Sequence, residues 1–247
     1  MTGALAERVA LVTNVHEYAG PAAVSALSSM GMLVACHDAR FVEEQARSAF
    51  TRAHPGTDAR GEQEPAGLVD AVLREHGRLD VVVSNDVAVP PRRPFDEVTV
   101  EEYREVLELL TVRPFALAKA AVPHMTQRRS GCLLFITSAT AVRPVAATAP
   151  YASARAATTS LATALAKELG GHGIQVNAIG PHWFQNPTYF PAGWDEDERR
   201  REIFEREVPL RRLGREEEMG ALIALLASGR ATPVTGQFIG FTSGWLP

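Results

Sequence analysis

The sequence predicts an α/β fold in which one doubly wound parallel sheet is flanked by helices on both faces. Short segments that are apolar almost throughout, such as RVALVT at 8–13 and CLLFIT at 132–137, alternate with longer helical patterns. Strands without polar alternation are typical of parallel sheets, because helices cover both faces of such a sheet. No repeats, low-complexity tracts or long linkers interrupt the pattern. We therefore expect residues 1–247 to form a single domain.

The first half of the chain contains three expected strands, at 8–13, 33–36 and 80–83. Helices are expected between and after them, at 20–30, 42–53 and 62–76, and two of these carry a proline near their start, where the missing N–H costs nothing. In the third of these helices, apolar residues recur at helical spacing along one stripe. This half is therefore predicted to supply strands and covering helices in alternation.

The second half continues the alternation. It contains a helical region at 100–127, a strand at 132–137, an Ala-rich helix at 150–169, a strand at 174–179, a loop rich in proline and aromatic residues at 180–194, a Glu/Arg-rich solvated helix face at 195–206, a helix at 216–227 and a strand at 237–241. Ligands of such sheets bind beyond the carboxyl ends of the strands. Polar residues follow these ends at 13–18, 37–38, 84–86, 138 and from 180 onward.

Composition places the chain among ordinary globular proteins, with 46% apolar and 22% charged residues. The net charge of −4 gives no reason to expect nucleic acid or an anionic membrane as a partner. No apolar segment reaches the roughly 18 residues of a membrane span, and Glu7 and Arg8 interrupt the N-terminus too early for a signal peptide. Cys36 and Cys132 lie in apolar segments, without the spacing of a disulfide framework or a metal site. We expect a cytoplasmic protein that needs no metal.

Three polar residues around the start of the Ala-rich helix are candidates for catalysis. Ser138 follows an apolar strand, and Tyr151 and Arg155 stand four positions apart on one face of the helix. A guanidinium next to a phenol favours the phenolate, so Tyr151 is a candidate general base. The Ser138 hydroxyl can bind the same substrate oxygen and hold it in place.

The turn after the first strand lacks the glycines that a dinucleotide site requires. Its sequence is TNVHEYAG, and only Gly20 remains of a G-x-x-x-G-x-G pattern that brings backbone close to a pyrophosphate. Glu17 adds a negative charge, and Tyr18 fills the space that the backbone would need. Asp38, about 20 positions further on, stands where a residue that binds the NAD ribose is found. Without the glycines we interpret Asp38 as part of the scaffold and predict no nucleotide cofactor.

Over almost its whole length the chain resembles the short-chain dehydrogenase/reductase superfamily, and within it the halohydrin dehalogenases. The matching segments include LVTNVHEYAGPAAV, FITSAT, YASARAA, AIGPHWFQNPTYFP and TGQFIGFTSGWLP. Reductases of the superfamily carry a Tyr-x-x-x-Lys motif and a Gly-rich first turn. Here Arg155 replaces the lysine, keeping the charge next to Tyr151 when no ribose needs to be bound. The resemblance implies a Rossmann-like fold, no cofactor, and a homotetramer.

The resemblance also implies the reaction. Tyr151 deprotonates the hydroxyl of a vicinal haloalcohol, Ser138 binds its oxygen, and the alkoxide displaces halide to form an epoxide; in reverse, azide, cyanide or nitrite opens the epoxide. The halide and substrate pocket is expected to consist of Tyr18, Pro181, His182, Trp183, Phe184, Tyr189 and Phe190. Ala88 and Val145 stand where relatives carry larger aromatic residues, which implies a wider pocket.

Two alternatives remain open at the level of sequence. An NAD(P)-dependent reductase with a degenerate turn is favoured by Asp38 and opposed by the lost glycines and by Arg155. A sheet domain kept as a binding scaffold is the other, and it gives no reason for an intact set of Ser138, Tyr151 and Arg155. Titration with NADH and NADPH tests the first alternative, and release of halide from a haloalcohol tests the second.

Overall fold

The sheet at the centre of the molecule has seven parallel strands in the order β3-β2-β1-β4-β5-β6-β7. It is seen in a computed structural model that describes residues 7–90, 92–194 and 196–246. The prediction that the N-terminus is not a signal peptide concerns residues that lie mostly outside these ranges. Asp195, the first residue of the predicted Glu/Arg run, also lies outside them. The strands are β1 (Val9–Val12), β2 (Leu33–His37), β3 (Thr57–Arg60), β4 (Val81–Ser84), β5 (Gly131–Ile136), β6 (Ile174–Pro181) and β7 (Phe238–Phe241). The predicted α/β, doubly wound parallel sheet is confirmed.

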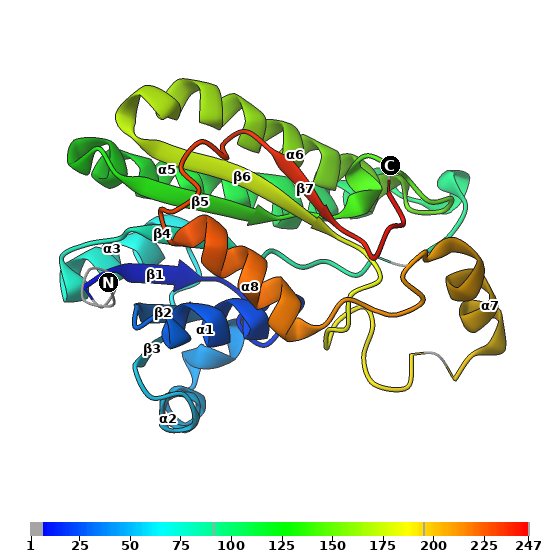
Figure 1. Ribbon diagram of the computed structural model, residues 1–247, viewed down its shortest axis with the longest axis horizontal. Helices are drawn as coiled ribbons and strands as arrows, with labels where there is room; N and C mark the ends of the chain where they lie inside the picture. Colours follow the sequence, from blue (N-terminus) through cyan, green and yellow to red (C-terminus); the bar gives the residue numbers. More distant parts are fainter. Residues whose placement is uncertain (1–6, 91, 195, 247) are drawn as a thin grey trace.

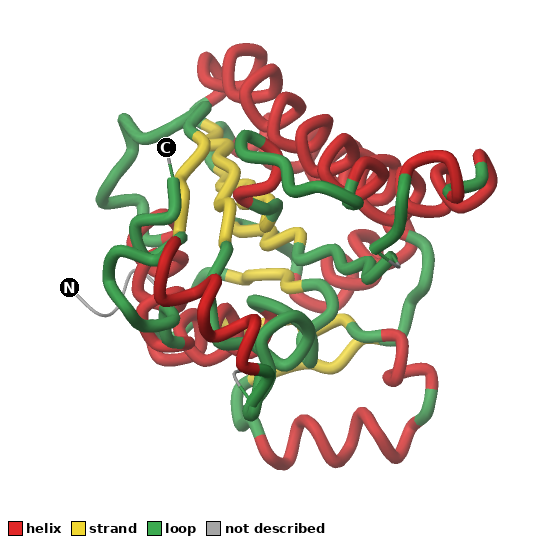
Figure 2. The backbone as a smooth tube through the Cα atoms, turned by 90° about the vertical axis from the view of Figure 1, so that its right-hand side faces the viewer, coloured by secondary structure: helices red, strands yellow, loops and turns green. Residues whose placement is uncertain are grey.

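Helices cover both faces of this sheet, as Figures 1 and 2 show. One face packs against α1 (Gly20–Ser29) and α8 (Glu216–Ala227), and the other against α3 (Pro65–His76), α5 (Arg113–Arg128) and α6 (Ala149–Leu169). Both layers are needed because every residue of β1, β4, β5 and β6 is buried. The remaining α-helices are α2 (Glu44–Ala53), α4 (Val100–Leu107) and α7 (Glu198–Glu207).

Several boundaries differ from the sequence prediction for identifiable reasons. Strand β3 was not predicted because it is a short edge strand with polar residues, TDAR, in which Arg60 and His76 of α3 both bind the Asp58 carboxylate. The expected helix at 42–53 is split, because Glu43 is extended between the 3₁₀ turn η1 (Ala39–Val42) and α2. The helical region at 100–127 is confirmed as α4, a π turn η3 (Glu108–Val112) and α5.

The short turns η2 (Phe95–Glu97), η4 (Ala139–Ala141) and η5 (Gly170–His172) complete the helical elements. Cys36 and Cys132, which lie in apolar segments of the sequence, are both free and buried. Within the described ranges, none of the helices combines the length and apolarity that crossing a bilayer requires.

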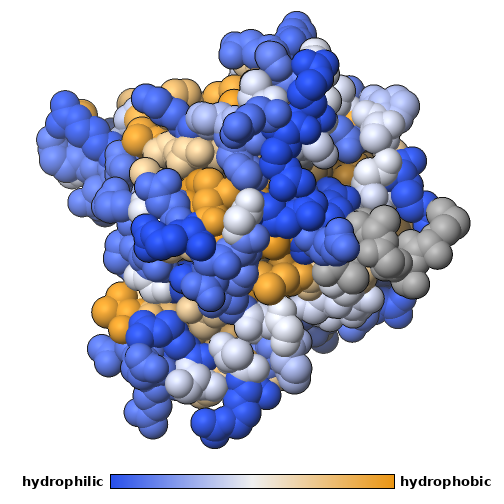
Figure 3. All heavy atoms as spheres, turned by 90° about the vertical axis from the view of Figure 1, so that its left-hand side faces the viewer, coloured by the Kyte–Doolittle hydropathy of each residue, from blue (hydrophilic) through white to orange (hydrophobic). Residues whose placement is uncertain are grey.

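Figure 3 views the molecule from the side of the amino ends of the strands, where a mostly hydrophilic surface is broken by small hydrophobic patches.

The opposite edge of the sheet, at the carboxyl ends of the strands, carries the candidate site. In Figure 1 the segment that follows β6 and helix α7 lie beyond these ends. Gly20 allows the first turn to close tightly onto α1, because a Cβ there would lie 2.5 Å from the carbonyl oxygen of Asn14. The sheet therefore brings together segments that lie far apart in the chain.

Candidate active site

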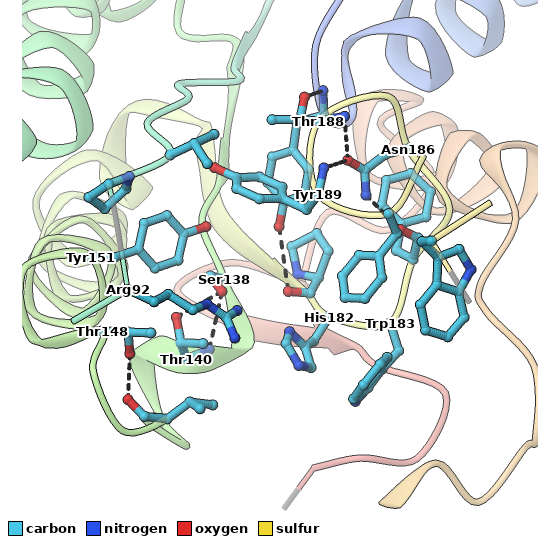
Figure 4. Close-up of a pocket in the computed structure, with 18 of the residues that line it drawn as sticks. Arg92, Ser138, Thr140, Thr148, Tyr151, His182, Trp183, Asn186, Thr188 and Tyr189 are labelled. Carbon is cyan, nitrogen blue, oxygen red and sulfur yellow. Dashed lines mark hydrogen bonds between the residues drawn. The ribbon is translucent and has the colours of Figure 1, made fainter. Parts of the chain in front are cut away.

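A cavity of about 710 Å³ lies at the carboxyl edge of the sheet. Ser138 and Tyr151 lie on one side of it, and residues of the loop after β6 lie on the other (Figure 4). All the predicted pocket residues line this cavity: Tyr18, Pro181, His182, Trp183, Phe184, Tyr189 and Phe190. Of the predicted site residues, only Arg155 does not line it.

Ser138 is held in a fixed orientation at the end of β5. Its backbone is extended, and its side chain caps the turn η4 by accepting hydrogen bonds from the Thr140 N–H at 3.2 Å and the Thr140 hydroxyl at 2.9 Å. Both bonds use the oxygen of Ser138 as acceptor. The hydroxyl proton of Ser138 is therefore free to be donated to a ligand in the cavity.

Arg155 lies beneath the cavity and is only 1% exposed. Its two terminal nitrogens donate to the carbonyl oxygens of Ile136 at 2.9 Å and Asp86 at 2.8 Å. The centre of its guanidinium is 5.0 Å from the ring centroid of Tyr151 and 5.8 Å from that of Tyr18. Burial alone would lower the pKa of Arg155, but the three surrounding tyrosine side chains outweigh it and raise that pKa. A permanent positive charge is thus fixed below the phenol rings.

Six consecutive backbone N–H groups of the first turn have acceptors within the protein. This holds for residues 15–20, all of which are described: Val15 donates to His37 O, His16 to Asp38 Oδ2, Glu17 to Asn14 O, Tyr18 to Thr188 Oγ1, Ala19 to Asn85 Oδ1 and Gly20 to Glu17 O. A phosphate bound at a helix N-terminus needs such groups to be free. None of these six N–H groups is therefore left for a pyrophosphate.

The loop after β6 closes over this turn. The Thr188 hydroxyl accepts from the Tyr18 N–H at 2.7 Å and donates to the Glu17 carboxylate at 2.7 Å. Asn186 shapes the loop, because its side-chain oxygen accepts from the N–H groups of Thr188 and Tyr189. Tyr18 itself is 4% exposed and adopts a left-handed conformation with φ of 48°, a position where glycine would be favoured.

The Asp38 carboxylate is hydrogen-bonded to other residues of the protein. Its carboxylate caps the turn η1 by accepting from the Arg40 N–H at 3.0 Å, and it binds the His16 ring at 2.8 Å. Burial raises the pKa of Asp38, but these hydrogen bonds outweigh it and lower that pKa below its usual value. The interpretation of Asp38 as part of the scaffold agrees with these contacts. Together, the first turn and Asp38 do not fit a nicotinamide dinucleotide.

Aromatic rings surround His182 in the cavity wall. Its ring centroid is 4.2 Å from that of Trp245, 5.0 Å from that of Trp183 and 5.8 Å from that of Phe190. Burial, and next the positive charge of Arg92, lower the pKa of His182 to about 3. The imidazole is therefore neutral at physiological pH.

Two neighbouring backbone N–H groups of this loop, those of Trp183 and Phe184, have no acceptor in the described part of the chain, although the groups on either side of them do. Trp183 is left-handed, with φ of 52°. Free N–H groups in such a loop form an anion-binding concavity without a formal cation. This part of the loop suits a small anion.

Some lining residues were not predicted from the sequence. They include Thr140, Arg92 of the loop after β4, Glu207 at the end of α7, and Trp245. Arg92 and Glu207 belong to charged runs that are ordinarily solvated, so no local pattern distinguishes them. Trp245 lies near the C-terminus, and only the fold brings it to His182.

Comparison with known proteins identifies the family. A family model described as enoyl-(acyl carrier protein) reductase matches residues 19–245. The chain is 31% identical to cis-4-hydroxycyclohexanecarboxylate dehydrogenase of Sinomonas cyclohexanicum over 99% of both chains.

Two solved structures are also similar. One, described as a dehalogenation enzyme, has a TM-score of 0.93 and 38% identity, covering 97% of this chain and 98% of its own. The other is a halohydrin dehalogenase bound to ethyl (2S)-oxiran-2-ylacetate, with a TM-score of 0.93 and 40% identity over 96% of both chains. With the parallel sheet, the strand-end serine and the tyrosine on α6, these similarities show that the chain belongs to the short-chain dehydrogenase/reductase superfamily.

Proposed function

We propose that this protein is a cofactor-independent halohydrin dehalogenase. It converts vicinal haloalcohols into epoxides with release of halide and a proton, and it opens epoxides with anions such as azide, cyanide or nitrite. The observation that carries the proposal is the closed first turn. There the Thr188 hydroxyl accepts the hydrogen bond of the Tyr18 N–H, at the position where a reductase would bind its cofactor. The similarity to two dehalogenase structures supports the same conclusion.

The residues along the cavity wall account for the formation of the alkoxide. Tyr151 takes the proton of the substrate hydroxyl, and Arg155, whose guanidinium centre lies 5.0 Å from the Tyr151 ring centroid, supplies a positive charge beside the phenol. Ser138 donates its free proton to the substrate oxygen and orients it. The alkoxide then attacks the neighbouring carbon from the side opposite the halogen, so the C–O bond forms as the carbon–halogen bond breaks.

The leaving halide requires a site on the far side of the cavity from Tyr151. The free N–H groups of Trp183 and Phe184 supply donors there, and ring edges of Tyr18 and Phe190 supply weak positive potential. In the reverse direction the same site holds the attacking anion. The loop after β6 thus has two roles in the proposal, because it closes the nucleotide cleft and binds halide.

Two measurements on the purified protein test the proposal. We expect chloride release from 1,3-dichloro-2-propanol with no added cofactor, and no saturable binding of NADH or NADPH by fluorescence quenching. Micromolar binding of either nucleotide would favour an NAD(P)-dependent reductase, the activity that the name of the similar cis-4-hydroxycyclohexanecarboxylate dehydrogenase indicates. Absence of both chloride release and nucleotide binding between pH 6 and 10 would favour a binding scaffold.

We also propose that the protein assembles as a homotetramer through its helical surface. Leu109, Val112 and Phe115 are exposed on η3 and α5, next to a groove formed with small residues of α6. Small and apolar residues on adjacent helices suit close helix–helix packing. Light scattering after size-exclusion chromatography would give four times the 26.7 kDa chain mass if this holds, and the monomer mass would contradict it.

A further inference from the structure

Arg92 brings a positive charge into the substrate cavity that the proposed reaction does not use. It lies in the loop between β4 and α4, and Figure 4 shows its side chain pointing into the cavity toward His182. Among the described residues, no carboxylate and no other acceptor forms an ion pair or hydrogen bond with its guanidinium, whereas the adjacent Arg93 binds Glu102. The Arg92 side chain is exposed, so a ligand can reach it from the cavity.

The other charges of the cavity do not neutralise Arg92. Arg200 of α7 also lines the cavity and has no acidic partner among the described residues. Glu207 is the one carboxylate among the lining residues that the structure describes, and it is engaged by the Trp245 indole at 3.0 Å and by Arg206 at 3.0 Å. His182, in contact with Trp245, is uncharged. The cavity opening therefore carries an excess of positive charge.

A guanidinium without a partner recognises a carboxylate best, because the two groups can form parallel N–H···O hydrogen bonds. The cavity has room for such a group, since Ala88 and Val145 contribute only small side chains to a volume of about 710 Å³. The anion site at Trp183 and Phe184 lies on the loop after β6, whereas Arg92 lies on the loop after β4. A substrate carboxylate and a leaving halide would thus be held by different segments.

We infer that Arg92 directs this enzyme toward vicinal haloalcohols and epoxides that carry a carboxylate. The inference rests on the proposed dehalogenase function. For 4-chloro-3-hydroxybutanoate, the 3-hydroxyl loses its proton to Tyr151, its oxygen bonds to carbon 4, and the C–Cl bond breaks to release chloride. The product is oxiran-2-ylacetate, and the carboxylate is unchanged. The ethyl ester of this product is the ligand of one of the similar structures, so it serves as the neutral counterpart.

The test compares kcat/KM for 4-chloro-3-hydroxybutanoate and its ethyl ester in the wild type and in Arg92→Gln. We expect the variant to lose about tenfold in kcat/KM for the carboxylate, or about 1.4 kcal/mol, mostly through KM, and less than twofold for the ester. Arg92→Lys should retain part of the preference, because it keeps the charge without the paired donors. Arg201→Gln on the exposed face of α7 is the control for an equal loss of charge, because Arg201 does not line the cavity.

The outcomes separate this inference from the function on which it rests. If the ester is converted but Arg92→Gln affects both substrates equally, Arg92 acts on the halide or on the fold, and the inference is wrong. If neither substrate is converted by the wild type, the proposed dehalogenase function fails. A preference for the carboxylate that decreases as salt is raised from 0.05 to 0.5 M would support the inference further, because salt screens an exposed ion pair.

Discussion

The Thr188 hydroxyl accepts a hydrogen bond from the Tyr18 N–H at 2.7 Å, although the two residues are 170 positions apart. This contact joins the loop after β6 to the turn after β1, where reductases of the superfamily hold their nucleotide. The same hydroxyl donates to Glu17, so one side chain satisfies two polar groups of the turn. The closed state of the turn therefore depends on a residue of a different segment.

Replacing Thr188 with valine should weaken both the fold and the site. The change keeps the shape of the side chain but leaves the Tyr18 N–H without an acceptor, which costs about 1–3 kcal/mol. We expect a lower midpoint of urea unfolding and reduced dehalogenation. Thr188→Ser keeps the hydroxyl and should resemble the wild type. A valine variant as stable as the wild type would show that the contact does not hold the turn closed.

Tyr151→Phe should remove the general base while leaving the fold intact. Loss of proton transfer by a positioned side chain costs about 10²- to 10⁴-fold in rate, measured here as halide release. Tyr103 of α4 is partly exposed and does not line the cavity, so Tyr103→Phe is the matched control and should remain active. Activity retained in Tyr151→Phe would exclude Tyr151 as the base.

We expect the site to need both the charge of Arg155 and the hydrogen-bonding geometry of its guanidinium. Lysine at this position keeps a charge but cannot bind the carbonyl oxygens of both Ile136 and Asp86 in the way the guanidinium does. We expect Arg155→Lys to lose activity and stability, by about 1–3 kcal/mol for an unpaired buried carbonyl, and to shift the pH–rate profile. Arg155→Gln should lose more activity than Arg155→Lys. Equal profiles for wild type and Arg155→Lys would mean that Arg155 does not assist Tyr151.

His182 should make the protein less stable in acid. Its pKa is about 3 in the folded protein and about 6.5 in the unfolded chain, so the unfolded state binds more protons between these values. The contribution to stability is complete above about pH 6.5 and falls with decreasing pH, by at most about 1.4 kcal/mol per pH unit. Urea unfolding at pH 7 and pH 5 should show a smaller acid loss in His182→Asn than in the wild type. An unchanged difference would contradict the neutral imidazole.

A crystal soaked in bromide should place the anion at the loop after β6. We expect anomalous density within hydrogen-bonding reach of the N–H groups of Trp183 and Phe184, because these donors have no acceptor among the described residues. Density only at Arg92 would instead assign halide binding to the side chain and contradict the backbone site.

The strands and their order of succession could be predicted from sequence because burial on both faces demands continuous apolar residues, as in VALV of β1 and GCLLFI of β5. Strand β3 could not, since an edge strand with one buried residue carries no such signal. Ser138 and Tyr151 could be selected because parallel strands expose their carboxyl ends at one edge, where both residues now line one cavity.

The sequence by itself determined the class of the fold, the lack of glycines in the first turn, and the pairing of Tyr151 with Arg155 on one helix. Only the tertiary structure decided how the turn is closed, through Thr188, and which charges reach the cavity, through Arg92 and Glu207. The physical reason is that local propensity and burial patterns act between near neighbours in the chain. Hydrogen bonds and charges in a site depend on distances between segments, which are set only when the sheet and its covering helices have packed.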